Sequence, residues 1–124
     1  MANDKTILVV DDKPFIVNLI KNKLETHNYN IITAFDGDEA VEKATKYHPD
    51  LIILDILMPK MDGISAADEI RSHKEISTTP IIFLTEIISE LQKKAYDQEI
   101  GGIYFIAKPF KEKEFLALIE KILG

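Results

Sequence analysis

The stretch Leu51–Gly63, with the sequence LIILDILMPKMDG, most constrains the fold of this chain. Its first four residues are apolar with no polar alternation, which is typical of a strand buried on both faces, as in a parallel sheet. Asp55 ends the apolar run, and Asp62-Gly63 is typical of a turn that starts a helix. A carboxylate therefore stands where a buried strand opens into a loop, the edge at which open α/β sheets bind ligands. An acid there can be a metal ligand, a nucleophile or a loop cap.

Short apolar runs alternate along the whole chain with segments that have helical spacing of apolar residues. This alternation predicts a doubly wound α/β fold, a five-stranded parallel sheet with five helices on its two faces and right-handed crossovers. We expect strands at residues 7–10, 31–34, 51–54, 81–84 and 103–106, and helices at about 14–28, 38–47, 64–73, 89–99 and 112–123.

Length and composition exclude several classes of protein. The chain has 124 residues, which predicts a single domain over 1–124 with no output domain. Its net charge of −6 disfavours direct binding to nucleic acid or to an anionic membrane. It contains no cysteine, so thiolate metal sites are excluded. With no apolar stretch near the roughly 20 residues of a membrane span, we expect no membrane insertion and a cytoplasmic location.

Polar side chains follow four of the five predicted strands. They are Asp11 and Asp12, Asp55, Thr85 and Lys108. The carboxyl ends of parallel strands meet at one edge of a sheet, so the three acids gather there if the first and third strands are neighbours. Their charges would repel one another, and a hard divalent cation such as Mg²⁺ would relieve that repulsion.

This set of groups suits a phosphoryl group carried by Asp55. Carboxylates form aspartyl phosphates, which makes Asp55 the natural nucleophile. A metal ion and Lys108 would neutralise the phosphoryl oxygens, and Thr85 would donate from its hydroxyl. Taken singly, each residue has a simpler interpretation: a loop cap for Asp55, a strand former for Thr85 and a solvated turn lysine for Lys108. Their convergence favours the phosphoryl site.

Over essentially its full length, the chain resembles the receiver domain of response regulators in two-component signalling. The motifs that carry this resemblance are VVDD with Pro14 after it, LIILDILMPKMDG, PIIFLT and FIAKPF. Their order and spacing are highly specific. The resemblance implies a flavodoxin-like three-layer fold with strand order 2-1-3-4-5, an order borrowed from a chemotaxis protein of this family.

The resemblance also implies a metal-assisted phosphoacceptor. Asp55 would take a phosphoryl group from a phosphohistidine. Asp12 and Asp55 would ligate Mg²⁺ or Mn²⁺, Asp11 would act mainly through water, and the backbone carbonyl of Leu57 would complete the protein ligands.

Four further residues take roles from the resemblance. Thr85 would hydrogen-bond one phosphoryl oxygen, and Lys108 would pair with another. The peptide bond between Lys108 and Pro109 would be cis, a state that X–Pro bonds adopt at low cost. Phe105 stands where the family has its rotating switch aromatic.

The chain departs from the family pattern at two positions and in one length. Glu86 follows Thr85 where the family usually has a small residue, and Leu57 offers no polar group to orient an attacking water. We therefore expect slow self-dephosphorylation, and a phosphorylated half-life of seconds would contradict this. The segment from Thr85 to Gly101 is one residue longer than usual, which predicts a shifted or irregular fourth helix.

Three functions compete. The first is a receiver that switches a protein-binding face. It catalyses only its own phosphorylation and slow dephosphorylation, and its partners are a sensor histidine kinase or histidine phosphotransfer protein and a downstream protein. The second is a Mg²⁺-dependent phosphohydrolase with an aspartyl nucleophile, which Leu57 disfavours because such enzymes need a second Asp there. The third is a receiver-like binding module that is never phosphorylated, which the atypical Glu86 supports.

Overall fold

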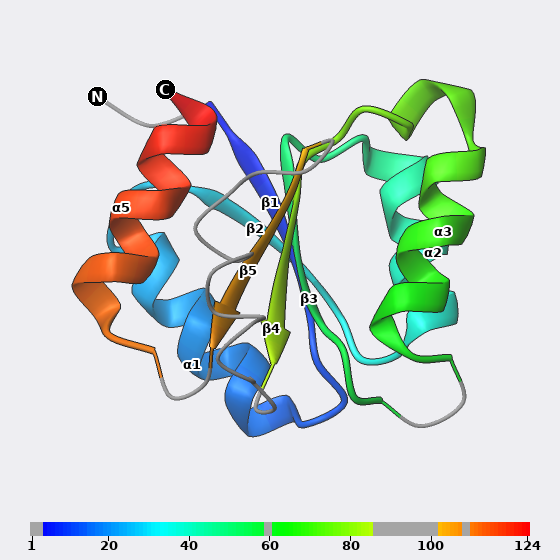
Figure 1. Cartoon of the computed structure of the whole chain (residues 1–124). Coiled ribbons are helices and arrows are strands. Elements are labelled where there is room, and N and C mark those ends of the chain that lie inside the picture. The colour runs from blue at the N-terminus through cyan, green and yellow to red at the C-terminus, as the bar shows by residue number, and fades with distance from the viewer. Residues whose placement is uncertain (1–3, 59–60, 86–101, 108–109) are drawn as a thin grey trace.

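The computed structural model describes residues 4–58, 61–85, 102–107 and 110–124 of the chain (Figure 1). From β1 to β4, strands and helices alternate along these residues, as predicted. The elements are β1 (Thr6–Val10), α1 (Pro14–Glu25), β2 (Asn30–Ala34), α2 (Gly37–Tyr47), β3 (Leu51–Asp55), α3 (Gly63–Ser72), the 3-10 turn η1 (Lys74–Ile76), β4 (Ile81–Thr85), β5 (Ile103–Ala107) and α5 (Glu112–Leu123).

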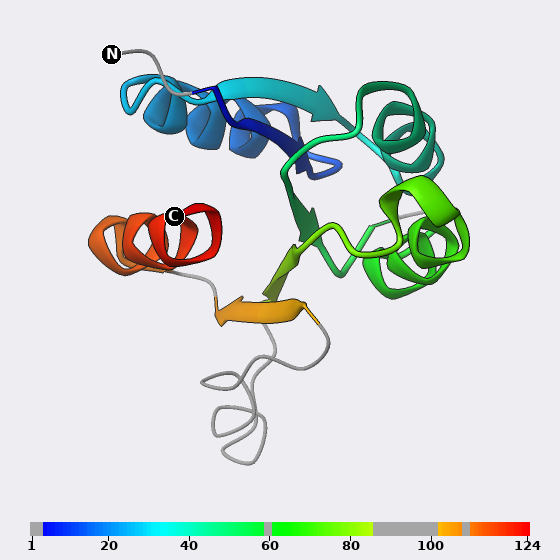
Figure 2. The same cartoon turned by 90° about the horizontal axis from the view of Figure 1, so that it is seen from above.

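The five strands form one parallel sheet in the order β2-β1-β3-β4-β5, which confirms the predicted order. Figure 2 shows α1 and α5 on one face of this sheet and α2 and α3 on the other. The predicted three-layer α/β architecture is therefore confirmed. The described residues contain four α-helices, and the predicted helix at about 89–99 lies outside them.

Alternate residues of the strands pack into separate cores on the two faces of the sheet. In β1, Leu8 and Val10 join the cluster beneath α2 and α3, whereas Ile7 and Val9 join the cluster beneath α1 and α5. The four apolar residues of β3 are buried, as their unbroken run predicts, and Asp55 at the end of the strand is buried with them. Burial along its whole length therefore fixes the position of the carboxyl end of β3.

A residue with a left-handed backbone follows each of two helices, α1 and α2. The first helix ends at Glu25, earlier than the predicted end near Asn28, and Asn28 itself has φ 67°. Asn tolerates this conformation better than most residues, so apolar spacing alone overestimates the helix. His48 caps α2 with φ 47°. These turns lead directly into β2 and β3.

Candidate functional site

Three aspartates meet at the carboxyl edge of the sheet, as the sequence predicts. Asp11 and Asp12 follow β1, and Asp55 is the last residue of β3, the neighbouring strand. One carboxylate oxygen from each lies within 4.8 Å of the others. Asp11 and Asp55 are 0% and 3% exposed, so two of these acids are buried. Close, buried carboxylates repel one another unless a cation shares them.

Asp11 is held by its own loop and by the neighbouring strand. Its Oδ1 accepts a hydrogen bond from the backbone N–H of Lys13 at 3.0 Å. Its backbone N–H donates to the carbonyl of Ala34, the last residue of β2, at 3.3 Å. Both the side chain and the backbone of this acid are therefore held by hydrogen bonds within the chain.

Asp12 fits the requirement for a cation most directly. Its Oδ1 is buried and accepts no hydrogen bond from the described part of the chain. The Nζ of Lys13, an exposed side chain, lies 3.7 Å from that oxygen. A buried carboxylate oxygen without a hydrogen bond costs free energy that a coordinated cation would recover. An all-oxygen set of three carboxylates suits Mg²⁺ or Mn²⁺.

Asp55 depends on a close approach between β3 and the start of α3. A Cβ placed on Gly63 would lie 2.2 Å from the carbonyl oxygen of Asp55, a distance that only a glycine permits. The Gly63 N–H donates to the carbonyl of Ile56 at 2.9 Å. Asp62 caps α3 by accepting from the N–H of Ser65 at 2.8 Å. Asp62-Gly63 is thus a turn and a helix start, as predicted.

Of the other predicted site residues, Leu57 and Phe105 lie within the described residues. The side chain of Leu57 is 52% exposed, two residues beyond Asp55. Phe105 in β5 is partly buried and packs on Phe83 of β4, with ring centroids 5.4 Å apart. The carbonyl ligand at Leu57 and the switch role of Phe105 stay predictions.

The remaining predicted residues lie outside what the structure describes. The backbone of Thr85 ends β4 and pairs with Ala107, at the same edge as Asp55, but its side chain is not among the described atoms. Glu86, Lys108 and Pro109 lie outside the described residues, so their roles and the cis peptide bond stay predictions.

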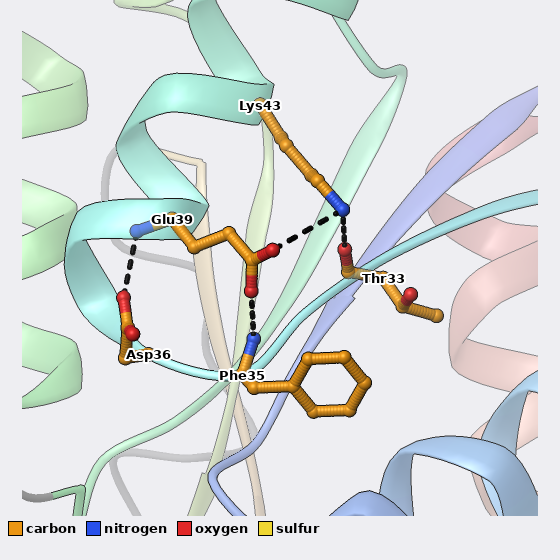
Figure 3. Close-up of polar contacts among 5 residues, drawn as sticks. All are labelled: Thr33, Phe35, Asp36, Glu39 and Lys43. Carbon is orange, nitrogen blue, oxygen red and sulfur yellow. Dashed lines mark hydrogen bonds and ion pairs between the residues drawn. The ribbon is translucent and has the colours of Figure 1, made fainter.

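The sequence alone does not indicate two features that support the site. One is the contact between Gly63 and the Asp55 backbone. The other is a set of polar contacts between α2 and the end of β2, in which Glu39 and Lys43 take part (Figure 3). The spacing of Asp36 and Glu39 is a capping-box signal, but its connection to the acids becomes visible only in three dimensions.

Comparisons with known proteins agree on one family. The family model for the response regulator receiver domain matches residues 7–120. The alkaline phosphatase synthesis transcriptional regulatory protein PhoP of Bacillus subtilis is 42% identical over 97% of this chain and 49% of its own length. The probable transcriptional regulator ycf27 of Cyanophora paradoxa is 37% identical over 98% of this chain and 49% of its own. The chain thus spans about half the length of these relatives.

Solved structures share the fold over nearly the whole chain. Chemotaxis protein CheY4 of Vibrio cholerae aligns with a TM-score of 0.84 and 31% identity, covering 98% of this chain and 100% of that one. The receiver domain of the sensor histidine kinase PA1611 of Pseudomonas aeruginosa, described with a magnesium ion in its active-site cleft, aligns with a TM-score of 0.84 and 29% identity. That alignment covers 98% of this chain and 99% of that one. Among the described helices, none combines the length and apolar composition needed to cross a bilayer.

Proposed function

From the premise that this chain belongs to the response regulator receiver domain family, we propose that Asp55 is its phosphoacceptor and that Asp11, Asp12 and Asp55 bind a divalent cation. The observation that carries the proposal is the convergence of these three carboxylates at the carboxyl edge of the sheet. It favours a phosphoacceptor over a structural carboxylate, because a capping aspartate needs no second or third acid beside it.

The proposed reaction transfers a phosphoryl group from a phosphohistidine to Asp55. A bond forms between a carboxylate oxygen and phosphorus while the bond from phosphorus to the imidazole nitrogen breaks. The donor imidazole keeps the electron pair of the broken bond and takes up a proton. Mg²⁺ or Mn²⁺, when bound, would neutralise charge on the phosphoryl oxygens.

Residues of the neighbouring strands would hold the phosphoryl group once it is on Asp55. In this proposal, the hydroxyl of Thr85 donates to one phosphoryl oxygen and the ammonium of Lys108 pairs with another. The backbone carbonyl of Leu57 is a further metal ligand. Support comes from the strand register, which aligns Asp55 with Leu84 and Thr85 with Ala107, so that β4 and β5 end at one level and β3 ends one residue earlier.

The switch would act through Phe105. Phe105 lies on β5, the outer strand of the sheet, and in the described structure its ring packs on Phe83 of the neighbouring strand β4. Phosphorylation would draw Thr85 toward the phosphoryl group and let Phe105 turn inward, which changes the face that includes β5 and α5. This is a shift between two populations, biased by new charge-assisted hydrogen bonds. The domain would therefore be a switch rather than an enzyme, catalysing only its own phosphorylation and slow dephosphorylation.

The proposed phosphodonor is a protein, either a sensor histidine kinase or a histidine phosphotransfer protein. Two large apolar side chains support this, because they are exposed in the segments directly after the acids. Phe15 is 74% exposed and Leu57 is 52% exposed. Exposed apolar side chains beside a reactive group suit docking of a protein surface better than entry of a hydrated small molecule.

This chain spans about half the length of the relatives that it matches, so our proposals concern residues 1–124 alone. The relative in Bacillus subtilis is named a transcriptional regulatory protein, and this chain spans about half of it. We restrict the expectation of no direct nucleic-acid contact to residues 1–124, whose net charge is −6. A downstream protein target and a cytoplasmic location belong to the same proposal.

Intact-mass measurement tests the proposed function. The purified chain is incubated with acetyl phosphate, either with Mg²⁺ or with a chelator. We expect one added phosphoryl group in Mg²⁺ and none in the chelator. Steady phosphate release without an adduct would favour the phosphohydrolase instead. Neither an adduct nor phosphate release would favour the unphosphorylated binding module.

A further inference from the structure

Two side chains of α2 hold the end of β2 (Figure 3). Glu39 Oε1 accepts a hydrogen bond from the backbone N–H of Phe35 at 2.6 Å. Lys43 Nζ donates to the backbone carbonyl of Thr33 and lies 3.4 Å from Glu39 Oε2. Asp36 Oδ1 accepts from the N–H of Glu39 at 2.8 Å, which places Glu39 at the start of the helix. The two side chains therefore act on the strand end as one linked pair.

The backbone between these two contacts also holds Asp11. Ala34 stands between Thr33 and Phe35 and is fully buried, and its carbonyl accepts the N–H of Asp11. At 3.3 Å, this hydrogen bond is slightly longer than is usual for an N–H···O bond, so a displacement of the strand end would weaken it further. A displaced strand end would move the backbone of a buried acid whose side chain belongs to the cluster of three.

We infer that Glu39 and Lys43 are positioning residues for the metal site. They hold the backbone on either side of Ala34, the last residue of β2, and that backbone fixes Asp11 relative to Asp12 and Asp55. The inference rests on the proposed function, because it takes the three acids to bind a divalent cation. Neither positioning residue needs to touch the ion. Residues that support metal ligands commonly contribute about tenfold or more to metal affinity.

Because Lys43 is positively charged, the direction of the change in cation affinity on its removal distinguishes a positioning role from a purely electrostatic one. If charge alone mattered, removal of a positive side chain near a cation site would strengthen cation binding. If position matters, Lys43→Met weakens binding, because the contact with the Thr33 carbonyl is lost. Lys43→Arg keeps both the charge and a donor, so it should restore affinity.

Electron paramagnetic resonance of free Mn²⁺ measures the affinity directly. We would titrate the wild-type chain, Lys43→Met, Lys43→Arg and Lys23→Met, and check folding of each by circular dichroism and urea unfolding. Lys23 is the matched control, because it forms a 2.6 Å ion pair with Glu112 between α1 and α5. Lys23→Met thus removes one lysine and one ion pair that do not involve the Thr33 and Phe35 contacts.

We expect Lys43→Met to raise the Kd for Mn²⁺ roughly tenfold, while Lys43→Arg and Lys23→Met stay within about twofold of the wild type. A Kd for Lys43→Met that is unchanged or lower would overturn the inference, and so would an equal loss in Lys23→Met. If the wild-type chain itself binds no Mn²⁺, the proposed metal site fails and the inference fails with it.

A second pair of variants serves if Lys43→Met does not fold. Glu39→Gln keeps an acceptor for the Phe35 N–H but removes the ion pair with Lys43. Asp38→Asn removes one negative charge from an exposed residue of the same helix turn. We expect Glu39→Gln to weaken Mn²⁺ binding several-fold more than Asp38→Asn does. Equal effects would mean that charge alone acts, and would overturn the inference.

Discussion

Two aspartates flank the central strand β3, and their surroundings differ. Asp50 precedes the strand, and its Oδ2 accepts the N–H of Thr6 at 2.8 Å, while its own N–H donates to the Thr6 carbonyl at 2.8 Å. Asp55 ends the strand beside Asp11 and Asp12. Through these two hydrogen bonds to Thr6, Asp50 links the start of β3 to the start of β1. Carboxylates that lie close together repel one another, and a cation can relieve that repulsion. The same residue type is thus structural at one end of the strand and, in our proposal, functional at the other.

The largest expected effect concerns metal linkage. In saturating Mg²⁺, at about a hundred times Kd, the wild-type chain should gain about 3 kcal/mol in its free energy of unfolding. Asp12→Asn should lose most of this gain, because it removes a charged ligand. Thermal unfolding with and without Mg²⁺ measures the difference. Asp50→Asn is the control and should keep the full gain. A full gain in Asp12→Asn would contradict the metal site.

A smaller effect follows at the contact behind Asp55. Gly63→Ala should lower the free energy of unfolding by about 2 kcal/mol, because the added methyl group would meet the Asp55 carbonyl. Urea unfolding measures it. Ser65→Ala in the same helix turn is an exposed control: it removes the 3.3 Å hydrogen bond from Ser65 Oγ to Asp62 Oδ2 and leaves the Asp62 cap on the Ser65 N–H in place. Wild-type stability in Gly63→Ala would show that the loop moves aside without cost.

The structural aspartate should show a loss of stability alone. Asp50→Ala removes the acceptor for the Thr6 N–H, which should cost about 1.5 kcal/mol in the free energy of unfolding. Its affinity for Mn²⁺ should be unchanged. The measurement is urea unfolding in chelator together with a Mn²⁺ titration. Altered metal affinity in Asp50→Ala would remove the distinction between the two ends of β3.

The smallest expected effect is a gain in the free energy of unfolding rather than a loss. In the absence of metal, Asp12→Asn should raise the free energy of unfolding by on the order of 1 kcal/mol, because it relieves repulsion with Asp11 and Asp55. The lost ion pair with Lys13 counts little, since the lysine is exposed. Urea unfolding in chelator provides the value. A clear loss of stability would mean that Asp12 is already satisfied without a cation.

The part of the site that the sequence predicts is the part encoded locally. The apolar runs before Asp11 and Asp55 indicate buried parallel strands, and both acids follow from the ends of those runs. That they become neighbours depends on strand order, which apolar runs do not encode and which the family resemblance supplied. Glu86 and Lys108 lie outside the described residues, so their predicted roles stay predictions.

What the sequence cannot predict depends on approach between distant elements. Gly63 has the signature of a turn, but its contact with the Asp55 carbonyl needs the geometry of α3 against β3. Likewise, the sequence alone indicates a solvated helix residue at Lys43, whereas in the structure its ammonium donates to the Thr33 carbonyl in β2. Periodicity records which face of an element is apolar, and it contains no information about which polar atom of another element comes within hydrogen-bonding distance.

The most direct test of the central claim compares the two ends of β3 in one experiment. Asp50→Asn and Asp55→Asn are each incubated with acetyl phosphate and Mg²⁺, and their intact masses are measured beside the wild-type chain. We predict one added phosphoryl group on the wild type and on Asp50→Asn, and none on Asp55→Asn. A phosphoryl adduct on Asp55→Asn equal to that on the wild type would contradict the assignment of Asp55 as the phosphoacceptor.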